Sequence, residues 1–325
     1  MKKFKNILIL GSLPLPCGGV TIHLERLCHA IAGSAVKSDI LFLDYKKQNF
    51  IYVIYNLLGA RICHLNFSNK KVRFLMVIFA FILRKKIIIT YHGKYNFSNI
   101  LDLFVLSLAN VNLVLNEYSF YSAKKKALLK TKVLLVSAFI PPVSDLGLIL
   151  SKETKNLVGE FVVKFDNIIC TNSHKYVLDS DTNDLYRIDM ILKCSLDFPE
   201  IGVIIVDPTG ELHTKYNEYV NLSNVLFITR PEPFVEILKK SQVFIRATTT
   251  DGDSLSVNEA LFLGIKVLAS DCVDRPKGCV LFKTNDIESY RANLKTVISD
   301  EKPSKRRLVD GSVQFIRVYK TLLEK

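Results

Sequence analysis

The chain has 325 residues, of which 49% are hydrophobic and 23% are charged, and its formal net charge at pH 7 is +13. This composition excludes a disordered chain, a collagen-like repeat and a small disulfide-stapled protein, and the length suits one large domain or two medium ones. Seven cysteines form no C-x-x-C pair, which fits reduced thiols and offers no zinc-site spacing. The charge is uneven, with a net charge of +14 for residues 1–150 and −1 for residues 151–325.

Short apolar runs rich in β-branched residues predict strands, and segments of helical period separate them. The expected strands of the first half are Asn6–Leu10, Ile62–Asn66, Ile87–Tyr91, Val111–Leu115 and Val133–Val136. After the first of these, apolar residues recur at i, i+3, i+4 and i+7, which predicts one face of a helix: Leu24, Leu27, Cys28 and Ile31.

The alternation restarts in the second half of the chain. The expected strands there are Asp166–Cys170, Gly202–Val206, Asn224–Ile228, Val243–Arg246 and Lys266–Ala269. The expected helices are residues 184–195, 211–220, 232–240, 254–263 and 286–299, and a last helix is expected within Lys302–Leu323. Apolar strands separated by helices are typical of parallel sheets covered on both faces.

A proline-containing segment, Ile140-Pro141-Pro142, and the polar stretch Ser151–Glu160 separate the two series. We therefore predict an α/β protein with two Rossmann-like, doubly wound parallel-sheet domains. The expected boundaries are residues 1–150 for the first domain, 151–300 for the second, and 301–325 for a C-terminal helix that packs back on the first domain.

Basic residues bracket an apolar run of ten residues, Phe74–Leu83, and a second basic cluster lies within Lys124–Lys132. The residues that flank the run are Lys70, Lys71, Arg73, Arg84, Lys85 and Lys86. The run is half as long as the roughly 20 residues of a membrane span. Its pattern fits an anionic membrane surface, and the alternative is a buried helix with solvated charged ends. We expect a cytoplasmic protein with a peripheral contact to the inner face of the cell membrane.

We do not expect nucleic acid as a partner, because the basic half has no basic–aromatic RNA motif and no helix-turn-helix pattern.

Two loops of the first half follow expected strands, where ligands bind in open parallel sheets. In the loop of residues 11–20, Gly18 and Gly19 precede a helix and allow close backbone approach to an anion. The loop is neither G-x-G-x-x-G nor a P-loop, and a simple connection is the alternative. In Thr90-Tyr91-His92-Gly93, His92 could hydrogen-bond to a sugar hydroxyl or move a proton, and a structural histidine is the alternative.

The most specific loop spans residues 246–260, where a strand ends at Arg246 and a helix begins near Ser254. Glu259 lies one turn into this helix, where its carboxylate can accept two hydroxyls of a ribose. The alternative is that Ser256-x-x-Glu259 forms a helix capping box. Four backbone N–H groups are expected to point at a phosphate or sugar oxygen, those of Gly252, Asp253, Ser254 and Leu255.

The segment Asp251-x7-Glu259, followed by residues 264–271 (GIKVLASD), resembles the E-x7-E segment of family-four retaining glycosyltransferases, of the bacterial surface polysaccharide type. Gly18-Gly19-Val20, His92-Gly93 and Ala138–Pro142 fall where that family has its glycine loop, its sugar-contacting histidine and its interdomain hinge. The resemblance covers nearly the whole chain in order. It implies a GT-B fold, in which two Rossmann-like domains face a cleft.

By this resemblance, Glu259 would hold the nucleotide ribose and Asp251 would stand near the donor sugar hydroxyls, in place of the family's first glutamate. The backbone of residues 252–255 would donate to the sugar and the diphosphate. His92 would contact the donor sugar from the other domain, and Gly18 and Gly19 would lie beside the diphosphate and the acceptor.

The basic pair of the family has no match in residues 171–187. A leaving nucleoside diphosphate needs positive charge, and Lys175 or Arg246 would supply it. For Arg246 the alternative is an ion pair with Asp251 or Asp253 that holds the loop.

The resemblance implies a hexosyltransferase that moves a sugar from a nucleotide-sugar donor to a glycan or lipid-linked acceptor, with retention, in capsule or lipopolysaccharide synthesis. No metal ion or other cofactor is expected, although Asp251-Gly252-Asp253 imitates a D-x-D motif. Two alternatives stay open: a nucleotide-sugar epimerase of the same fold, and a catalytically inactive sugar-nucleotide-binding subunit.

Overall fold

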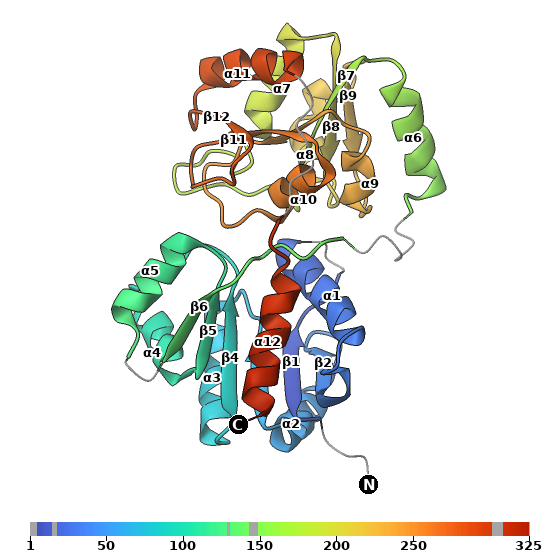
Figure 1. Cartoon of the computed structure of the whole chain (residues 1–325). Helices are drawn as coiled ribbons and strands as arrows, with labels where there is room; N and C mark the ends of the chain where they lie inside the picture. The colour runs from blue at the N-terminus through green and yellow to red at the C-terminus, as the bar shows by residue number, and fades with distance from the viewer. Residues whose placement is uncertain (1–4, 15–17, 129–130, 143–148, 301–307, 325) are drawn as a thin grey trace. The chain divides into compact units, whose positions relative to one another are not determined.

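The strands expected from the sequence assemble into two six-stranded parallel sheets (Figure 1). The structure is a computed structural model that describes residues 5–14, 18–128, 131–142, 149–300 and 308–324. It divides into two compact units, Met1–Ile140 with Val309–Lys325 (unit 1) and Pro141–Leu308 (unit 2). The expected boundaries at residues 150 and 300 both lie inside unit 2, because the chain changes unit at the proline pair and returns to unit 1 just before its last helix.

The sheet of unit 1 has the strand order β2-β1-β3-β4-β5-β6. Its strands are β1 (Ile7–Gly11), β2 (Ile40–Asp44), β3 (Ile62–Leu65), β4 (Lys86–Tyr91), β5 (Val111–Val114) and β6 (Lys132–Leu135). Its helices are α1 (Gly19–Ala32), α2 (Phe50–Gly59), α3 (Lys70–Ile82), α4 (Ile100–Leu108), α5 (Glu117–Lys126) and α12 (Gly311–Leu323), with a short 3-10 helix at Lys37–Asp39.

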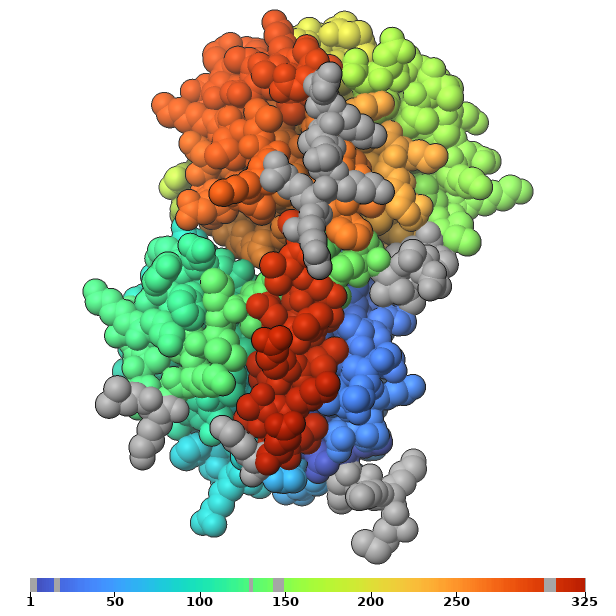
Figure 2. All heavy atoms as spheres, viewed as in Figure 1, coloured from blue at the N-terminus to red at the C-terminus, as the bar shows by residue number. Residues whose placement is uncertain are grey.

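Helices cover both faces of this sheet. The connection from β1 to β2 runs across the sheet in the opposite direction to the later connections. Because each crossover is right-handed, α1 lies on the opposite face from α2–α5. Alternate residues of β1 enter different cores, as strand geometry requires. Leu8 packs with residues of α2–α5, whereas Ile9 packs with residues of α1 and α12. The outer side of α12 (red) forms part of the surface of unit 1 in Figure 2.

The sheet of unit 2 has the strand order β12-β11-β10-β7-β8-β9. Its strands are β7 (Asn167–Asn172), β8 (Ile201–Val206), β9 (Val225–Ile228), β10 (Val243–Arg246), β11 (Lys266–Ser270) and β12 (Cys279–Phe282). Its helices are α6 (Lys152–Val162), α7 (Ile188–Asp197), α8 (Glu211–Lys215), α9 (Phe234–Leu238), α10 (Leu255–Leu263) and α11 (Ile287–Ser299), with a 3-10 helix at Asn217–Tyr219. Residues of α7 and α11 pack on one face, and residues of α6, α9 and α10 pack on the other.

The fold class expected from the sequence is therefore confirmed, with two doubly wound parallel sheets. All ten expected strands are present, and two further strands at sheet edges, β2 and β12, were not predicted from the sequence. Most of their residues are only half buried, and a short apolar run does not by itself distinguish a strand from a loop. Within the described residues, no helix has the length and apolar character needed to cross a membrane.

Candidate functional site

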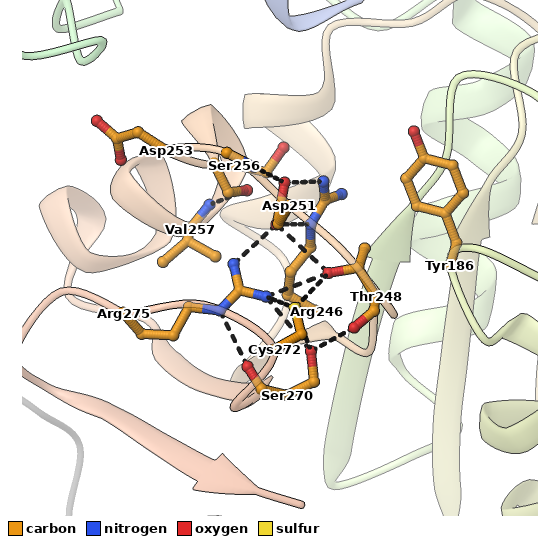
Figure 3. Close-up of polar contacts among 12 residues, drawn as sticks. Tyr186, Arg246, Thr248, Asp251, Asp253, Ser256, Val257, Ser270, Cys272 and Arg275 are labelled. Atoms are coloured by element: carbon orange, nitrogen blue, oxygen red, sulfur yellow. Dashed lines mark hydrogen bonds and ion pairs between the residues drawn. The ribbon is translucent and has the colours of Figure 1, made fainter. Parts of the chain in front are cut away.

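The loop between β10 and α10 centres on the carboxylate of Asp251 (Figure 3). Arg246, the last residue of β10, donates to both of its oxygens, from Nε to Oδ2 at 2.9 Å and from Nη2 to Oδ1 at 3.0 Å. Arg275 reaches the same carboxylate from the loop after β11, with Nη1 at 2.7 Å from Oδ2. The Gly252 N–H also donates to Asp251 Oδ1, at 3.0 Å. Asp251 thus accepts from two guanidinium groups and from the backbone of the residue that follows it.

These three side chains are mostly removed from solvent, with exposed fractions of 9% for Asp251, 14% for Arg246 and 2% for Arg275. Burial alone would raise the pKa of the Asp251 carboxyl, but the charges and hydrogen bonds of Arg246 and Arg275 lower it to about 2. Asp251 is therefore ionised at neutral pH. Two guanidinium groups against one carboxylate give the group a net charge of +1 at the carboxyl edge of the sheet.

Arg275 was not predicted from the sequence as a site residue. Its guanidinium also donates to the Ser270 carbonyl and to Thr248 Oγ1, both at 3.1 Å, and so connects the ends of β10 and β11. Arg275 lies outside the motif of residues 251–259. One feature of the sequence could have indicated it: Arg275 follows an expected strand. Because the carboxyl ends of adjacent parallel strands lie side by side, a residue that follows β11 can reach the loop that follows β10.

The sequence leaves two roles open for Arg246: a positive charge for the leaving diphosphate, and an ion pair that holds the loop. The structure shows the ion pair, with Asp251 as the partner. The Arg246 guanidinium is bidentate on Asp251 and lies over the ring of Tyr186, with Cζ 5.2 Å from the ring centroid. Asp253 points away from both guanidinium groups in Figure 3, and its Oδ1 accepts from Asn258 Nδ2 at 2.7 Å. Arg246 therefore holds the loop through Asp251, and any charge it offers to a ligand comes from a paired guanidinium.

The helix that follows begins at Leu255 with Ser254 as its N-cap, and Ser254 Oγ accepts from the Val257 N–H at 3.4 Å. The alternative of a capping box from Ser256 to Glu259 is wrong, because Ser256 lies inside the helix, where its hydroxyl accepts from the Asn172 side chain. Glu259 lies on α10 and is buried.

Lys175 follows β7, the neighbour of β10, so it lies at the same carboxyl edge as Arg246. Its side chain is exposed, and the turn that carries it is closed by Ser173, whose hydroxyl donates to the Lys175 carbonyl at 2.6 Å. Asn172 Oδ1 is buried there without a hydrogen-bond partner in the described part of the chain. The edge thus carries an accessible lysine and a polar atom that a ligand could satisfy.

Unit 1 carries a second polar cluster, at the carboxyl ends of β1, β3 and β4. His92 follows β4, and its Nε2–H donates to Oδ1 of Asn66, which follows β3, at 3.1 Å. The His23 ring of α1 meets the His92 ring edge-on, with centroids 5.2 Å apart. Among the described residues, Ser12 Oγ, His23 Nε2 and Asn66 Nδ2 are buried without a hydrogen-bond partner. Leaving such an atom unpaired costs about 1–3 kcal/mol, so three of them together mark a place where ligand hydroxyls would be favourable.

Burial keeps the histidines of this cluster neutral. It lowers the pKa of His23 to about 4, although the hydrogen bond to the Ala138 carbonyl opposes the change. Burial, followed by the nearby His23, also lowers the pKa of His92 well below its ordinary value. At neutral pH both rings carry one donor and one acceptor nitrogen, which suits recognition of hydroxyl groups.

The glycine pair lies at the start of α1, with Gly18 as its N-cap and Gly19 as its first residue. The Gly18 N–H donates to Thr21 Oγ1 at 3.0 Å. A Cβ added at either glycine would meet nothing within 4 Å, so the space beside this backbone is open. Residues 15–17 of the loop lie outside the described residues. In the described part of the chain, no group of three or more His, Cys, Asp or Glu residues could hold a metal ion.

No protein-family profile and no curated protein sequence matches the chain. Solved structures match it over nearly its whole length. HepE of Anabaena, solved with UDP and glucose, has a TM-score of 0.66 and 13% identity, covering 98% of this chain and 99% of that one. The lipopolysaccharide outer core galactosyltransferase WaaB has a TM-score of 0.61 and 12% identity, covering 98% and 99%. The chain has the GT-B fold.

A UDP-GlcNAc 2-epimerase of Methanocaldococcus jannaschii shares this fold, with a TM-score of 0.63 and 11% identity, covering 98% of this chain and 100% of that one. Transferases and an epimerase are thus among the structures with the same GT-B fold. At these identities the similarity establishes the architecture, and the chemistry of this GT-B chain has to be argued from its own residues.

Proposed function

We propose that this GT-B chain is a glycosyltransferase that uses a nucleotide-sugar donor. The observation that carries the proposal is the loop from Arg246 to α10. With Arg275 from the loop after β11, it forms a group of net charge +1 and places a helix N-terminus and the buried Glu259 at the same sheet edge. Positive charge and a helix N-terminus favour a diphosphate, and a carboxylate one turn into the helix favours ribose hydroxyls.

In this proposal Glu259 binds the ribose, and the first turn of α10, from Ser254 and Leu255, faces the diphosphate. Asp251 orients the two arginines and Gly252, because its oxygens already accept from these groups. Arg246 and the accessible Lys175 stabilise the charge that develops on the leaving diphosphate.

The unit 1 cluster would bind sugar hydroxyls. His92 and Asn66, with the unsatisfied Ser12 Oγ and His23 Nε2, offer neutral donors and acceptors at one sheet edge. Gly18 and Gly19 leave open space beside the start of α1, which suits a bulky glycan or lipid-linked acceptor. Retention, a hexose as the transferred sugar and a role in surface polysaccharide synthesis are part of the proposal. They rest on the resemblance of Asp251-x7-Glu259 and on the outer-core activity in the name of WaaB.

The test is a donor screen with the full chain and UDP-glucose, UDP-galactose and UDP-N-acetylglucosamine, since HepE was solved with UDP-glucose. A nucleotide-sugar at 100 times its Kd stabilises the folded protein by about 2.7 kcal/mol, which a thermal shift detects. Release of UDP with transfer of the sugar to water or an added glycan supports the proposal. The absence of any thermal shift with all three donors contradicts it.

Two other functions give different results in the same screen. Recovery of an epimerised sugar nucleotide indicates an epimerase, which the fold shared with the M. jannaschii enzyme makes the second candidate. A thermal shift without UDP release or epimerisation indicates a binding subunit. That outcome would fit an Asp251 whose carboxylate is already engaged by two arginines.

A further inference from the structure

Helix α2 lies on the surface of unit 1 and has no charged residue in its ten-residue sequence. Its inner side is buried in the core through Val53 and Leu57. Its outer side exposes large apolar side chains, including Phe50 (68% exposed), Ile51 (75%) and Leu58 (54%). A surface helix normally presents polar residues to water, so this side needs a partner.

The two neighbouring helices extend this apolar surface. α3 exposes Leu75 and Ile82, and α4 exposes Ile100 and Phe104. All three helices pack on the same face of the first sheet. We call their outer surface the α2–α4 face.

Contacts between the helices make the α2–α4 face continuous. At one end, Lys85 just after α3 donates from Nζ to the Leu58 carbonyl of α2 at 2.6 Å. Between α3 and α4, the rings of Phe74 and Phe104 meet edge-on with centroids 6.5 Å apart. The exposed apolar residues of α3 and α4 therefore lie on one surface, and α2 joins this surface at the end that carries Leu58.

The charge around this surface is almost entirely positive. Residues 45–108 contain ten lysines and arginines and a single acidic residue, Asp102. The Asp102 side chain is 4% exposed and is paired with the buried Arg73 at 2.7 Å, so it gives the surface no accessible negative charge. Lys46 and Lys71 are exposed beside the starts of α2 and α3.

We propose that the α2–α4 face binds peripherally to an anionic phospholipid bilayer. Its apolar side chains would enter the boundary between headgroups and acyl chains, and its lysines would contact the lipid phosphates. A second copy of the chain would bring two cationic surfaces together, which like-charge repulsion opposes. The proposal goes beyond the transferase function and does not depend on it.

The test is co-sedimentation of the full chain with phosphatidylcholine vesicles and with vesicles that also contain phosphatidylglycerol. We expect binding to the anionic vesicles that weakens as salt is added, because the Debye length shortens. The double variant Ile51→Asp/Leu58→Asp should bind at least ~10-fold more weakly, since it places charge in the apolar layer. The matched control is Val163→Asp/Leu196→Asp, at exposed apolar positions of unit 2, which should bind like the parent.

The lysines provide a second arm of the test. Lys46→Gln/Lys71→Gln should weaken binding to anionic vesicles, by roughly five-fold for each residue. Circular dichroism confirms that each variant is folded before binding is compared. Equal binding to neutral and anionic vesicles, or no binding to either, overturns the proposal. A dimer that the α2 variant separates, without vesicle binding, assigns the surface to a second copy instead.

Discussion

At the scale of single residues, Asp251 shows how this chain departs from the family that it resembles. The resemblance places the first acidic residue of the motif beside the donor sugar, yet both oxygens of Asp251 accept from Arg246 and Arg275. The carboxylate thus positions two cations rather than offering itself to a sugar hydroxyl. The two arginines differ in accessibility, because Arg246 keeps 14% of its side chain exposed and Arg275 only 2%.

This difference in exposure predicts that replacing Arg246 mainly affects turnover, whereas replacing Arg275 mainly affects stability. Arg246→Met should lower kcat by ~100-fold or more, in line with the loss of one stabilising donor, while Tm falls less than for Arg275→Met because Arg275 still pairs with Asp251. Arg275→Met should lower the free energy of unfolding by about 3 kcal/mol, because it leaves buried polar groups unpaired. Steady-state kinetics and thermal melts measure the two effects. Normal turnover of Arg246→Met would exclude an electrophilic role for Arg246.

The assignment of Glu259 is tested by Glu259→Gln, which keeps the shape of the side chain but removes its charge. If the carboxylate binds the ribose, the loss of charge-assisted hydrogen bonds should raise the Kd for the nucleotide by about 10- to 150-fold, equal to roughly 1.5–3 kcal/mol. Isothermal titration with UDP measures this directly. An unchanged Kd would contradict the assignment, and Ser223→Ala, at an exposed position in the loop before β9, is the neutral control.

At the scale of elements, α12 depends on a close backbone approach at its first residue. The Gly311 N–H donates to the Phe139 carbonyl at 2.7 Å, and a Cβ at this position would lie 2.1 Å from the Ser137 carbonyl oxygen. Only glycine therefore fits where the chain re-enters unit 1. Phe315 and Tyr319 of the same helix are fully buried in the core on that face of the sheet.

Gly311→Ala should consequently lower the free energy of unfolding of unit 1 by about 1–3 kcal/mol, since the start of α12 must move away from the strand end. The matched control is Gly159→Ala in α6, where an added Cβ meets nothing within 4 Å. There the substitution should stabilise by about 0.4–1 kcal/mol. Urea unfolding followed by circular dichroism compares the two variants, and equal effects would contradict the close approach.

At the scale of the whole molecule, the two units differ in how deeply their titrating histidines are buried: His23 and His64 of unit 1 are buried, whereas His174 of unit 2, whose pKa is also lowered by burial, is exposed at the surface. Burial, followed by the nearby His23, lowers the pKa of His64 to about 3, and burial lowers that of His23 to about 4, both in unit 1. The ordinary value of 6.5 applies when the chain is unfolded, so the unfolded form binds protons first as the pH falls. In unit 2, Asp251 has a pKa of about 2 against an ordinary 3.8. Its stabilising effect is therefore lost only below pH 3.8.

Unit 1 should consequently lose more stability than unit 2 on mild acidification, because its two buried histidines have the larger pKa shifts and the exposed His174 of unit 2 contributes less. Its free energy of unfolding should be constant above pH 6.5 and fall between pH 6.5 and 4 by up to about 1.4 kcal/mol per pH unit for each buried histidine. Hydrogen exchange at pH 7.5 and 5.0 assigns the change to a unit. His64→Gln, which removes one titrating ring, should flatten the dependence, and an identical dependence in parent and variant would contradict the assignment.

The sequence by itself determined ten of the twelve described strands and the three candidate site loops, because apolar runs, helical period and glycine or acidic turns are local signals. Each of these loops follows a strand, so their place at a carboxyl edge also followed from the sequence. The sequence left open whether Arg246 would pair with an acid or with a ligand.

Only the tertiary structure decided which loops meet. Arg275 reaches Asp251 because β11 lies beside β10, and Asn66 reaches His92 because β3 lies beside β4. The exposed apolar side of α2 was also visible only in the structure. An apolar helix sequence does not show which of its sides the rest of the protein covers. Strand order and helix cover arise from contacts between residues far apart in the chain. Local sequence patterns do not specify such contacts individually. The contacts form when the apolar faces of the helices and strands are buried against one another.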